Sequence, residues 1–105
     1  MNKKEHVPLT EAVYYILLAL EKPMHGYAIM QYIAEISHER INMGPGTLYG
    51  AIKTLLEKNW IELIDGEVGS RKKEYVLTDI GREVVLNEMN RLEELLNNGK
   101  RIMKG

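Results

Sequence analysis

Two groups of side chains in this chain have the types and spacing needed to bind an anionic polymer. The first shares one face of a predicted helix and is small, aromatic or basic: Thr47, Tyr49, Gly50, Lys53 and Thr54. The second is the run Arg71, Lys72 and Lys73, with no acidic residue between positions 69 and 73. Cations and hydroxyl donors of this kind contact phosphate oxygens, and side chains on a helix can reach base edges. The chemistry indicated is binding rather than covalent catalysis.

A helix over residues 45 to 58 must position the first group. Gly44 and Pro45 mark its start, because proline at the first helical position loses no hydrogen bond. Asn59 suits the left-handed conformation that ends a helix. Its buried face is predicted from residues at helical spacing, namely Leu48, Ile52, Leu55 and Leu56.

A β-hairpin must position the second group. Residues 60 to 64 alternate, with Ile61 and Leu63 predicted to point inward, and a second strand runs through Tyr75 and Leu77 after the turn at 65–70. Residues 41 to 43 are expected to add a short third strand. A helix followed by a hairpin with a basic tip is typical of a winged helix. The predicted fold is therefore mainly α with a small β-hairpin, a winged helix-turn-helix followed by a C-terminal helix.

Two further helices precede this unit. The first is predicted to begin near Pro8 or Leu9 and to end near Leu20. It has one apolar stripe, comprising Leu9, Ala12, Val13, Ile16, Leu17 and Leu20, and a second comprising Tyr14, Tyr15 and Leu18. A helix that is apolar on two sides has more surface than a small domain covers, which favours burial against a second subunit over simple exposure of the aromatic rings. The second helix is predicted over residues 25 to 37, with inward positions Ile29, Met30, Ile33 and Ile36.

The last helix is predicted to start at Thr78 as N-cap, with Asp79 in its first turn. Val85, Met89, Leu92 and Leu96 recur at spacings of 4, 3 and 4, as in a coiled-coil seam, and Met103 resumes the register after an expected interruption at Gly99. A single packed helix would give a similar pattern. Together with the doubly apolar first helix, the seam predicts a homodimer whose interface contains Tyr14, Leu18, Val85, Met89, Leu92 and Leu96. The expected organisation is a flexible arm over 1–8, a winged helix-turn-helix over 9–77, and a dimerisation helix and tail over 78–105.

Composition limits the alternatives. The 105 residues suit one domain, and the absence of cysteine excludes disulfides, thiol catalysis and cysteine-ligated zinc. The longest apolar stretch, residues 12 to 20, is too short to span a bilayer, and a cytoplasmic location is expected. The net charge of −1 argues against a nucleic-acid partner, but the charges are separated along the chain. Residues 69–73 carry +3, and residues 78–98 carry −3 from five acidic and two basic side chains, so the basic tip would orient the molecule on DNA.

Enzymatic and metal-binding alternatives fit poorly. Ser37 and Ser70 lie outside any nucleophile-elbow motif. The fragment Gly44-x-Gly46 resembles part of a phosphate loop, but Tyr49 occupies the third glycine position and no strand-helix-strand unit surrounds it. His25 has no second ligand at useful spacing. The expectation is therefore no catalytic residue, no metal and no cofactor.

The order and spacing of several short motifs between residues 9 and 82 carry a family resemblance. They are the run Leu9 to Leu17, His25-Gly26-Tyr27, Gly46-Thr47-Leu48-Tyr49 with Leu55 and Leu56, Trp60-Ile61, Arg71-Lys72-Lys73 with Tyr75, and Leu77-Thr78 with Gly81. On these residues the chain resembles the PadR family of bacterial transcriptional regulators, in its short form with a single C-terminal helix.

The resemblance implies a dimeric repressor that places helix 45–58 in the major groove of double-stranded DNA and its wing on the backbone or minor groove. The implied DNA-contact residues are Gly46, Thr47, Tyr49, Gly50, Lys53, Arg71, Lys72 and Lys73. Glu74, often aromatic in the family, and Val76, often basic, depart from the usual pattern and reduce the charge of the wing. A winged helix that binds another protein, without specific DNA binding, is the alternative function.

The resemblance also implies a small effector, because similar proteins respond to phenolic acids or bind flat hydrophobic drugs between their subunits. Drug-binding relatives stack the compound on a tryptophan of the last helix, and the last helix of this chain has no tryptophan. Trp60, its only tryptophan, is predicted to belong to the core. The effector pocket is expected between subunits, lined by Tyr14, Tyr15, Met89 and Leu92.

Overall fold

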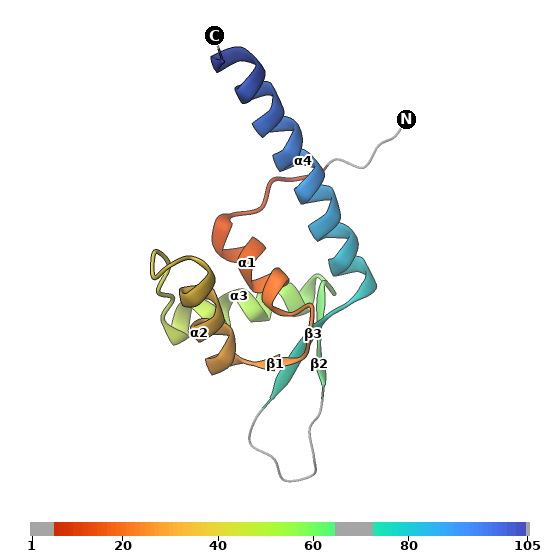
Figure 1. Cartoon of the computed structure of the whole chain (residues 1–105). Coiled ribbons are helices and arrows are strands. Elements are labelled where there is room, and N and C mark those ends of the chain that lie inside the picture. Colours follow the sequence, from red (N-terminus) through yellow and green to blue (C-terminus); the bar gives the residue numbers. More distant parts are fainter. Residues whose placement is uncertain (1–5, 65–72, 105) are drawn as a thin grey trace.

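A small body of three helices and a three-stranded sheet carries one long helix that projects away from it (Figure 1). The structure, a computed structural model, describes residues 6–64 and 73–104. Within these ranges the elements are, in order, α1 (Glu11–Ala19), β1 (Met24–His25), α2 (Gly26–Ile36), α3 (Pro45–Glu57), β2 (Ile61–Ile64), β3 (Glu74–Leu77) and α4 (Asp79–Met103).

Local capping residues set where the helices begin. The Thr10 hydroxyl accepts a hydrogen bond from the Val13 amide at 3.1 Å, and the Leu9 amide donates to Glu88 at 3.3 Å instead of entering the helix. For this reason α1 starts at Glu11, later than predicted. The His25 ring caps α2, Pro45 occupies the first turn of α3, and Thr78 caps α4 as predicted. Asn59 has a φ of 64° and ends α3 in the left-handed conformation, also as predicted.

The sheet has the order β1-β3-β2 and is antiparallel throughout. The strands predicted around Ile61 and Tyr75 are confirmed. The third strand is not at residues 41–43, which connect α2 to α3 without strand structure; it is β1, which pairs Met24 with Tyr75. A two-residue strand leaves no periodicity in the sequence, and only the fold brings the turn after α1 beside β3. The Leu77 amide also donates to the Leu20 carbonyl at 2.8 Å, which ties β3 to the end of α1.

The core lies where α1, α2 and α3 meet the sheet and the first half of α4. Its most deeply buried side chains are Ile16, Leu17, Leu20, Ile29, Ile33, Leu48, Leu55 and Ile61. These positions were predicted to point inward, whereas Leu63 was wrongly placed there. Leu63 is 42% exposed although Ile61, two residues earlier on the same edge strand, is 2% exposed, because the end of β2 toward the wing extends beyond the helices (Figure 1).

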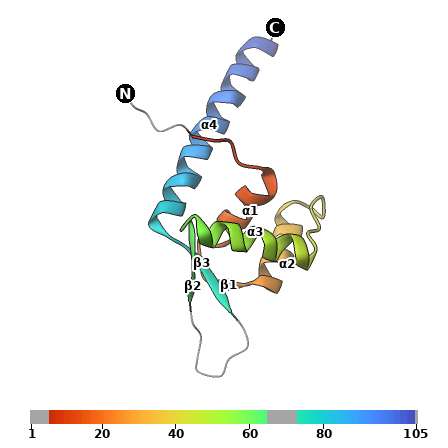
Figure 2. The same cartoon turned by 180° about the vertical axis from the view of Figure 1, so that it is seen from behind.

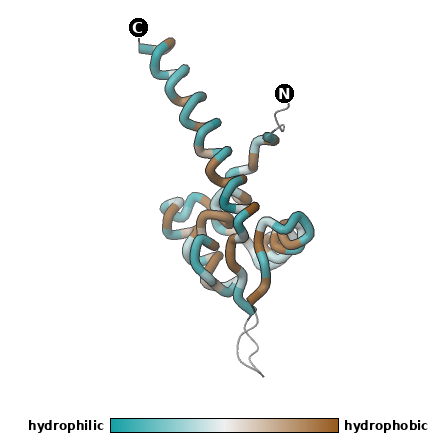
Figure 3. Tube along the Cα trace, turned by 90° about the vertical axis from the view of Figure 1, so that its right-hand side faces the viewer, coloured by the Kyte–Doolittle hydropathy of each residue, from teal (hydrophilic) through white to brown (hydrophobic). Residues whose placement is uncertain are grey.

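Helix α4 begins in tight contact with the body and then leaves it (Figures 1 and 2). A Cβ at Gly81 would overlap the Trp60 carbonyl and lie 2.9 Å from its carbon, so only glycine permits this approach. The interruption predicted at Gly99 is wrong, because the helix continues through it to Met103. Hydrophobic residues recur along the projecting half of α4 (Figure 3), and they remain exposed among the residues that the structure describes.

Candidate nucleic-acid interface

Helix α3 divides into a buried and an exposed face. Leu48, Ile52 and Leu55 are at most 2% exposed, and they fasten the helix to the core. The opposite face is exposed as predicted and carries Gly46, Thr47, Tyr49, Gly50, Lys53 and Thr54. No acidic residue occurs between Pro45 and Leu56. The arrangement therefore presents one cation and several small or hydroxyl-bearing groups on a rigid surface.

Tyr49 differs from its neighbours on this face, because its ring lies over the first residue of α2. Its Cζ and Cε1 atoms are 2.6 and 3.1 Å from the position that a Cβ on Gly26 would occupy. The side chain remains 47% exposed. Burial, followed by the effect of Tyr49, raises the pKa of Tyr75 above its ordinary value. Tyr49 is thus both a surface residue and a packing residue.

The wing is described only at its base. Lys73 is exposed immediately before β3, and Glu74 is half-buried and pairs with His25 and Ile64 across the sheet. Arg71 and Lys72, and the predicted turn over residues 65–70, lie outside the described residues. Of the predicted basic cluster, the structure therefore places Lys73 alone.

A groove of about 710 Å³ lies between the segment before α1, the second half of α3 and the first turns of α4. Trp60 lines it and is half-buried at the edge of the core rather than inside it, with the Lys58 ammonium 5.1 Å from the ring centroid. None of the four residues predicted to form an effector pocket lines this groove: Tyr14, Tyr15, Met89 and Leu92.

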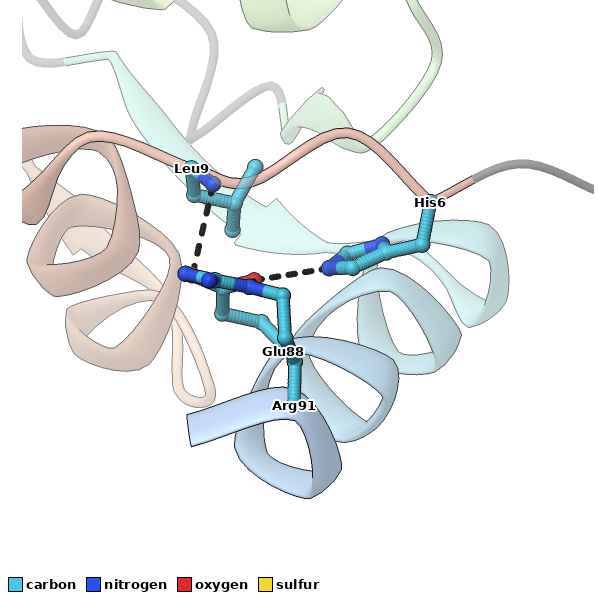
Figure 4. A network of polar contacts seen from close by, with 4 residues as sticks. All are labelled: His6, Leu9, Glu88 and Arg91. Atoms are coloured by element: carbon cyan, nitrogen blue, oxygen red, sulfur yellow. Dashed lines mark hydrogen bonds and ion pairs between the residues drawn. The ribbon is translucent and has the colours of Figure 1, made fainter. Parts of the chain in front are cut away.

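Glu88, one of the five acidic residues between positions 78 and 98, is buried and joins α4 to the segment before α1 (Figure 4). Glu88 is 1% exposed and accepts hydrogen bonds from Arg91 at 2.9 and 2.7 Å, from His6 at 2.7 Å, and from the Leu9 amide. Since an ionised carboxylate only accepts, the His6 Nε2 must donate. The hydrogen bonds from Arg91, above all, lower the pKa of Glu88 to about 2 against the opposing effect of burial.

Two signals could have revealed this cluster. Glu88 lies three residues after Val85 and four before Leu92, on the inward side of α4, and Arg91 follows at the spacing of an ion pair on one helix. The consequence is that His6, assigned to the flexible arm by the sequence, is bound to α4.

The predicted dimer seam divides into two parts. Val85 is 6% exposed and belongs to the core of its own chain, so it has little surface to offer a partner. Met89, Leu92 and Leu96 are 46%, 38% and 57% exposed. Tyr14 and Leu18 on α1 are partly buried, and the Tyr14 ring centroid lies 6.2 Å from that of Tyr15.

The polar residues weighed for other chemistry have structural partners. The His25 Nδ1 accepts from the Ala28 amide at 3.3 Å, and the buried Ser37 Oγ accepts from the Ile41 amide at 3.0 Å. Across residues 6–64 and 73–104, no group of three or more acidic or histidine side chains is arranged to hold a metal ion. No helix in that part of the chain has the length and apolar character needed to cross a membrane.

Comparison with known protein families identifies the chain. The model of the transcriptional regulator PadR-like family matches residues 15–87. This range includes α2, α3, the hairpin, the start of α4 and all of α1 except its first turn. This chain belongs to the PadR-like family of transcriptional regulators. The winged helix-turn-helix expected from the resemblance is thereby confirmed, and the family is one of regulators rather than enzymes.

Two curated relatives share part of the sequence of this PadR-like regulator. An uncharacterized 37.1 kDa protein in transposon TN4556 of Streptomyces fradiae is 36% identical over 81 residues, and an uncharacterized protein X of Lysinibacillus sphaericus is 34% identical over 67 residues. The matches cover 76% and 62% of this chain, but only 22% and 62% of the respective relatives.

Solved structures share the fold of the PadR-like regulator. A transcriptional regulator from Clostridium thermocellum has a TM-score of 0.76 at 24% identity, covering 88% of this chain and 89% of its own. A PadR-like transcription factor from Bacteroides fragilis has a TM-score of 0.70 at 27% identity, covering 86% and 87%. Bacillus subtilis PadR, solved in complex with operator DNA, has a TM-score of 0.67 at 27% identity, covering 78% of this chain and 48% of that protein.

Proposed function

We propose that this PadR-like regulator represses transcription as a homodimer on an inverted-repeat operator and that a small aromatic or hydrophobic compound controls it. The exposed, acid-free face of α3 is the observation that carries the proposal, because it combines Lys53 with small residues that let the helix approach a base pair. The operator complex of Bacillus subtilis PadR, which has the same fold, supports it.

The proposed contacts divide by chemistry. Gly46, Thr47, Gly50 and Lys53 enter the major groove, while Arg71, Lys72 and Lys73 neutralise backbone phosphates. Tyr49 borders this surface, and its role is developed below. A two-fold dimer would present two such surfaces, so the half-sites should lie about one helical turn, roughly 34 Å, apart.

The proposed dimer interface combines the projecting half of α4 with α1 of the partner. Met89, Leu92 and Leu96 are apolar and exposed on the single chain, and Tyr14 and Leu18 are only partly covered. An effector pocket formed by Tyr14, Tyr15, Met89 and Leu92 would be completed only between two subunits. Release of labelled operator DNA by aromatic compounds in a titration tests the effector part.

Replacing Lys53 with alanine is expected to weaken specific operator binding by roughly 1 to 3 kcal/mol, because a good contact to a base edge contributes about that much. The fold should persist, since the side chain is exposed. Fluorescence anisotropy with labelled operator measures the loss. Lys100→Ala removes the same charge at the far end of α4 and serves as the control; equal losses in the two variants would contradict a specific role for Lys53.

Replacing Lys72 with glutamine is expected to weaken binding to every DNA sequence alike. Loss of one phosphate contact should flatten the dependence of log affinity on log salt by about one unit per half-site. Titrations at four salt concentrations give the slope. An unchanged slope would remove Lys72 from the phosphate contacts.

The proposed function is tested by titrating the protein onto DNA from upstream of its own gene and onto a scrambled duplex. Selective, salt-dependent binding supports the operator reading. Absence of binding at low salt on both duplexes would favour the alternative, a winged helix that binds a protein partner.

A further inference from the structure

The contact between Gly26 and Tyr49 joins the two helices of the helix-turn-helix. Gly26 is the first residue of α2 and is buried, and the tip of the Tyr49 side chain of α3, with its hydroxyl nearest, lies directly against it. The position that a Cβ would take on residue 26 is 2.6 Å from the Tyr49 Cζ, far inside ordinary carbon contact distance. Any other residue at position 26 would displace the ring.

The start of α2, against which Tyr49 packs, is joined to the strand that leads out of the wing. His25, which caps α2, pairs with Glu74, and Met24 pairs with Tyr75 on β3. Tyr75 is 6% exposed, and burial, followed by the effect of Tyr49, raises its pKa above the ordinary value. Tyr49 of α3 therefore packs against the end of α2 whose capping residue, His25, pairs with β3.

The apolar residues of α3 attach it to the core along one side only. Its buried residues, Leu48, Ile52 and Leu55, lie on that side, with Ala51 and Leu56 partly buried beside them, so a contact on another side of the helix adds a separate constraint on its rotation. A ring on the flank of the helix, seated on a glycine of the neighbouring helix, opposes such rotation. The orientation of Thr47, Gly50 and Lys53 follows from it.

We propose that Tyr49 is a positioning residue: its ring, seated on Gly26, fixes the rotation of α3 so that Thr47, Gly50 and Lys53 face the DNA. This inference rests on the proposed function. It assigns Tyr49 a packing role in place of the direct DNA contact that the family resemblance implies.

A double-mutant cycle tests the inference. Gly26→Ala and Tyr49→Ala should each weaken operator binding by about tenfold, and the double variant should bind no more weakly than Tyr49→Ala, because both changes break the same contact. Binding to scrambled DNA should change little, so the selectivity ratio falls. Gly44→Ala is the matched control, since nothing lies within 4 Å of a Cβ there. Multiplicative losses in the double variant would overturn the inference.

The conservative variant separates packing from hydrogen bonding. Tyr49→Phe keeps the ring on Gly26 and should recover most of the affinity that Tyr49→Ala loses. A loss equal to that of Tyr49→Ala would show that the ring does not hold α3 in place, and would overturn the positioning role.

A measurement without DNA keeps the inference separate from the proposed function. In amide NMR spectra of the free protein, Gly26→Ala should shift the signals of Thr47, Gly50 and Lys53, whereas Gly44→Ala should leave those of Gly50 and Lys53 in place. Unmoved signals in Gly26→Ala would overturn the inference. If those signals shift but the wild-type protein shows no operator selectivity, the proposed function fails and the structural role of the contact stands.

Discussion

Replacing Leu92 with aspartate should convert the dimer into monomers and abolish operator binding with it. Two-fold symmetry would bring two carboxylates together in an apolar seam without partners, and desolvation costs several kcal/mol for each buried ion. The dissociation constant of the dimer should therefore rise by at least about a hundredfold. Sedimentation velocity across a range of protein concentrations measures this change.

The structure identifies Leu92 as a suitable site because the body of the chain stops covering α4 at that point. Val85 is buried by its own chain, whereas Leu92 is 38% and Leu96 57% exposed. A charge at Leu92 should therefore act on association more than on folding. Asn90→Asp adds the same charge on a different side of α4 and should leave the dimer intact. If Leu92→Asp sedimented as the wild-type dimer does, the proposed seam would be wrong.

Replacing Glu88 with glutamine should lower the free energy of unfolding by about 2 to 3 kcal/mol at neutral pH, because it leaves Arg91 and His6 without their anion. The two partner side chains are 28% and 23% exposed, so solvent compensates part of the loss. Urea denaturation at several protein concentrations measures the change and separates folding from association. Glu94→Gln, an exposed position on the same helix, is the control.

The pH dependence of the unfolding free energy should reveal the titration of Glu88. In the folded protein the pKa of Glu88 is lowered from 4.5 to about 2, so its contribution is complete above pH 4.5 and disappears as the pH falls toward 2. At 1.36 kcal/mol for each pKa unit, the full contribution is about 3 kcal/mol. The difference in unfolding free energy between wild type and Glu88→Gln should shrink over this interval. A difference that stayed constant would mean that Glu88 is not ionised in the native protein.

Local signals in the sequence were sufficient for most of the helical framework. The stripe of Leu48, Ile52 and Leu55, the left-handed stop at Asn59 and the cap at Thr78 each depend on residues within a few positions of one another. Such patterns predict the structure correctly because helix periodicity and capping depend on residues close together in the sequence. The exposed face of α3 followed directly from its buried face.

The remaining features depend on contacts between distant segments, which spacing alone does not reveal. β1 exists because the turn after α1 meets β3. Leu63 is exposed because its end of β2 extends beyond the helices, and Val85 is buried because the beginning of α4 packs on the core (Figure 1). Glu88 is separated from His6 by 82 positions, and Gly26 from Tyr49 by 23. The sequence by itself determined the family, the helices and the basic, acid-free composition of the candidate surface. Only tertiary packing decided which acid is buried and which aromatic ring holds α3 in place, since both depend on where separate elements dock.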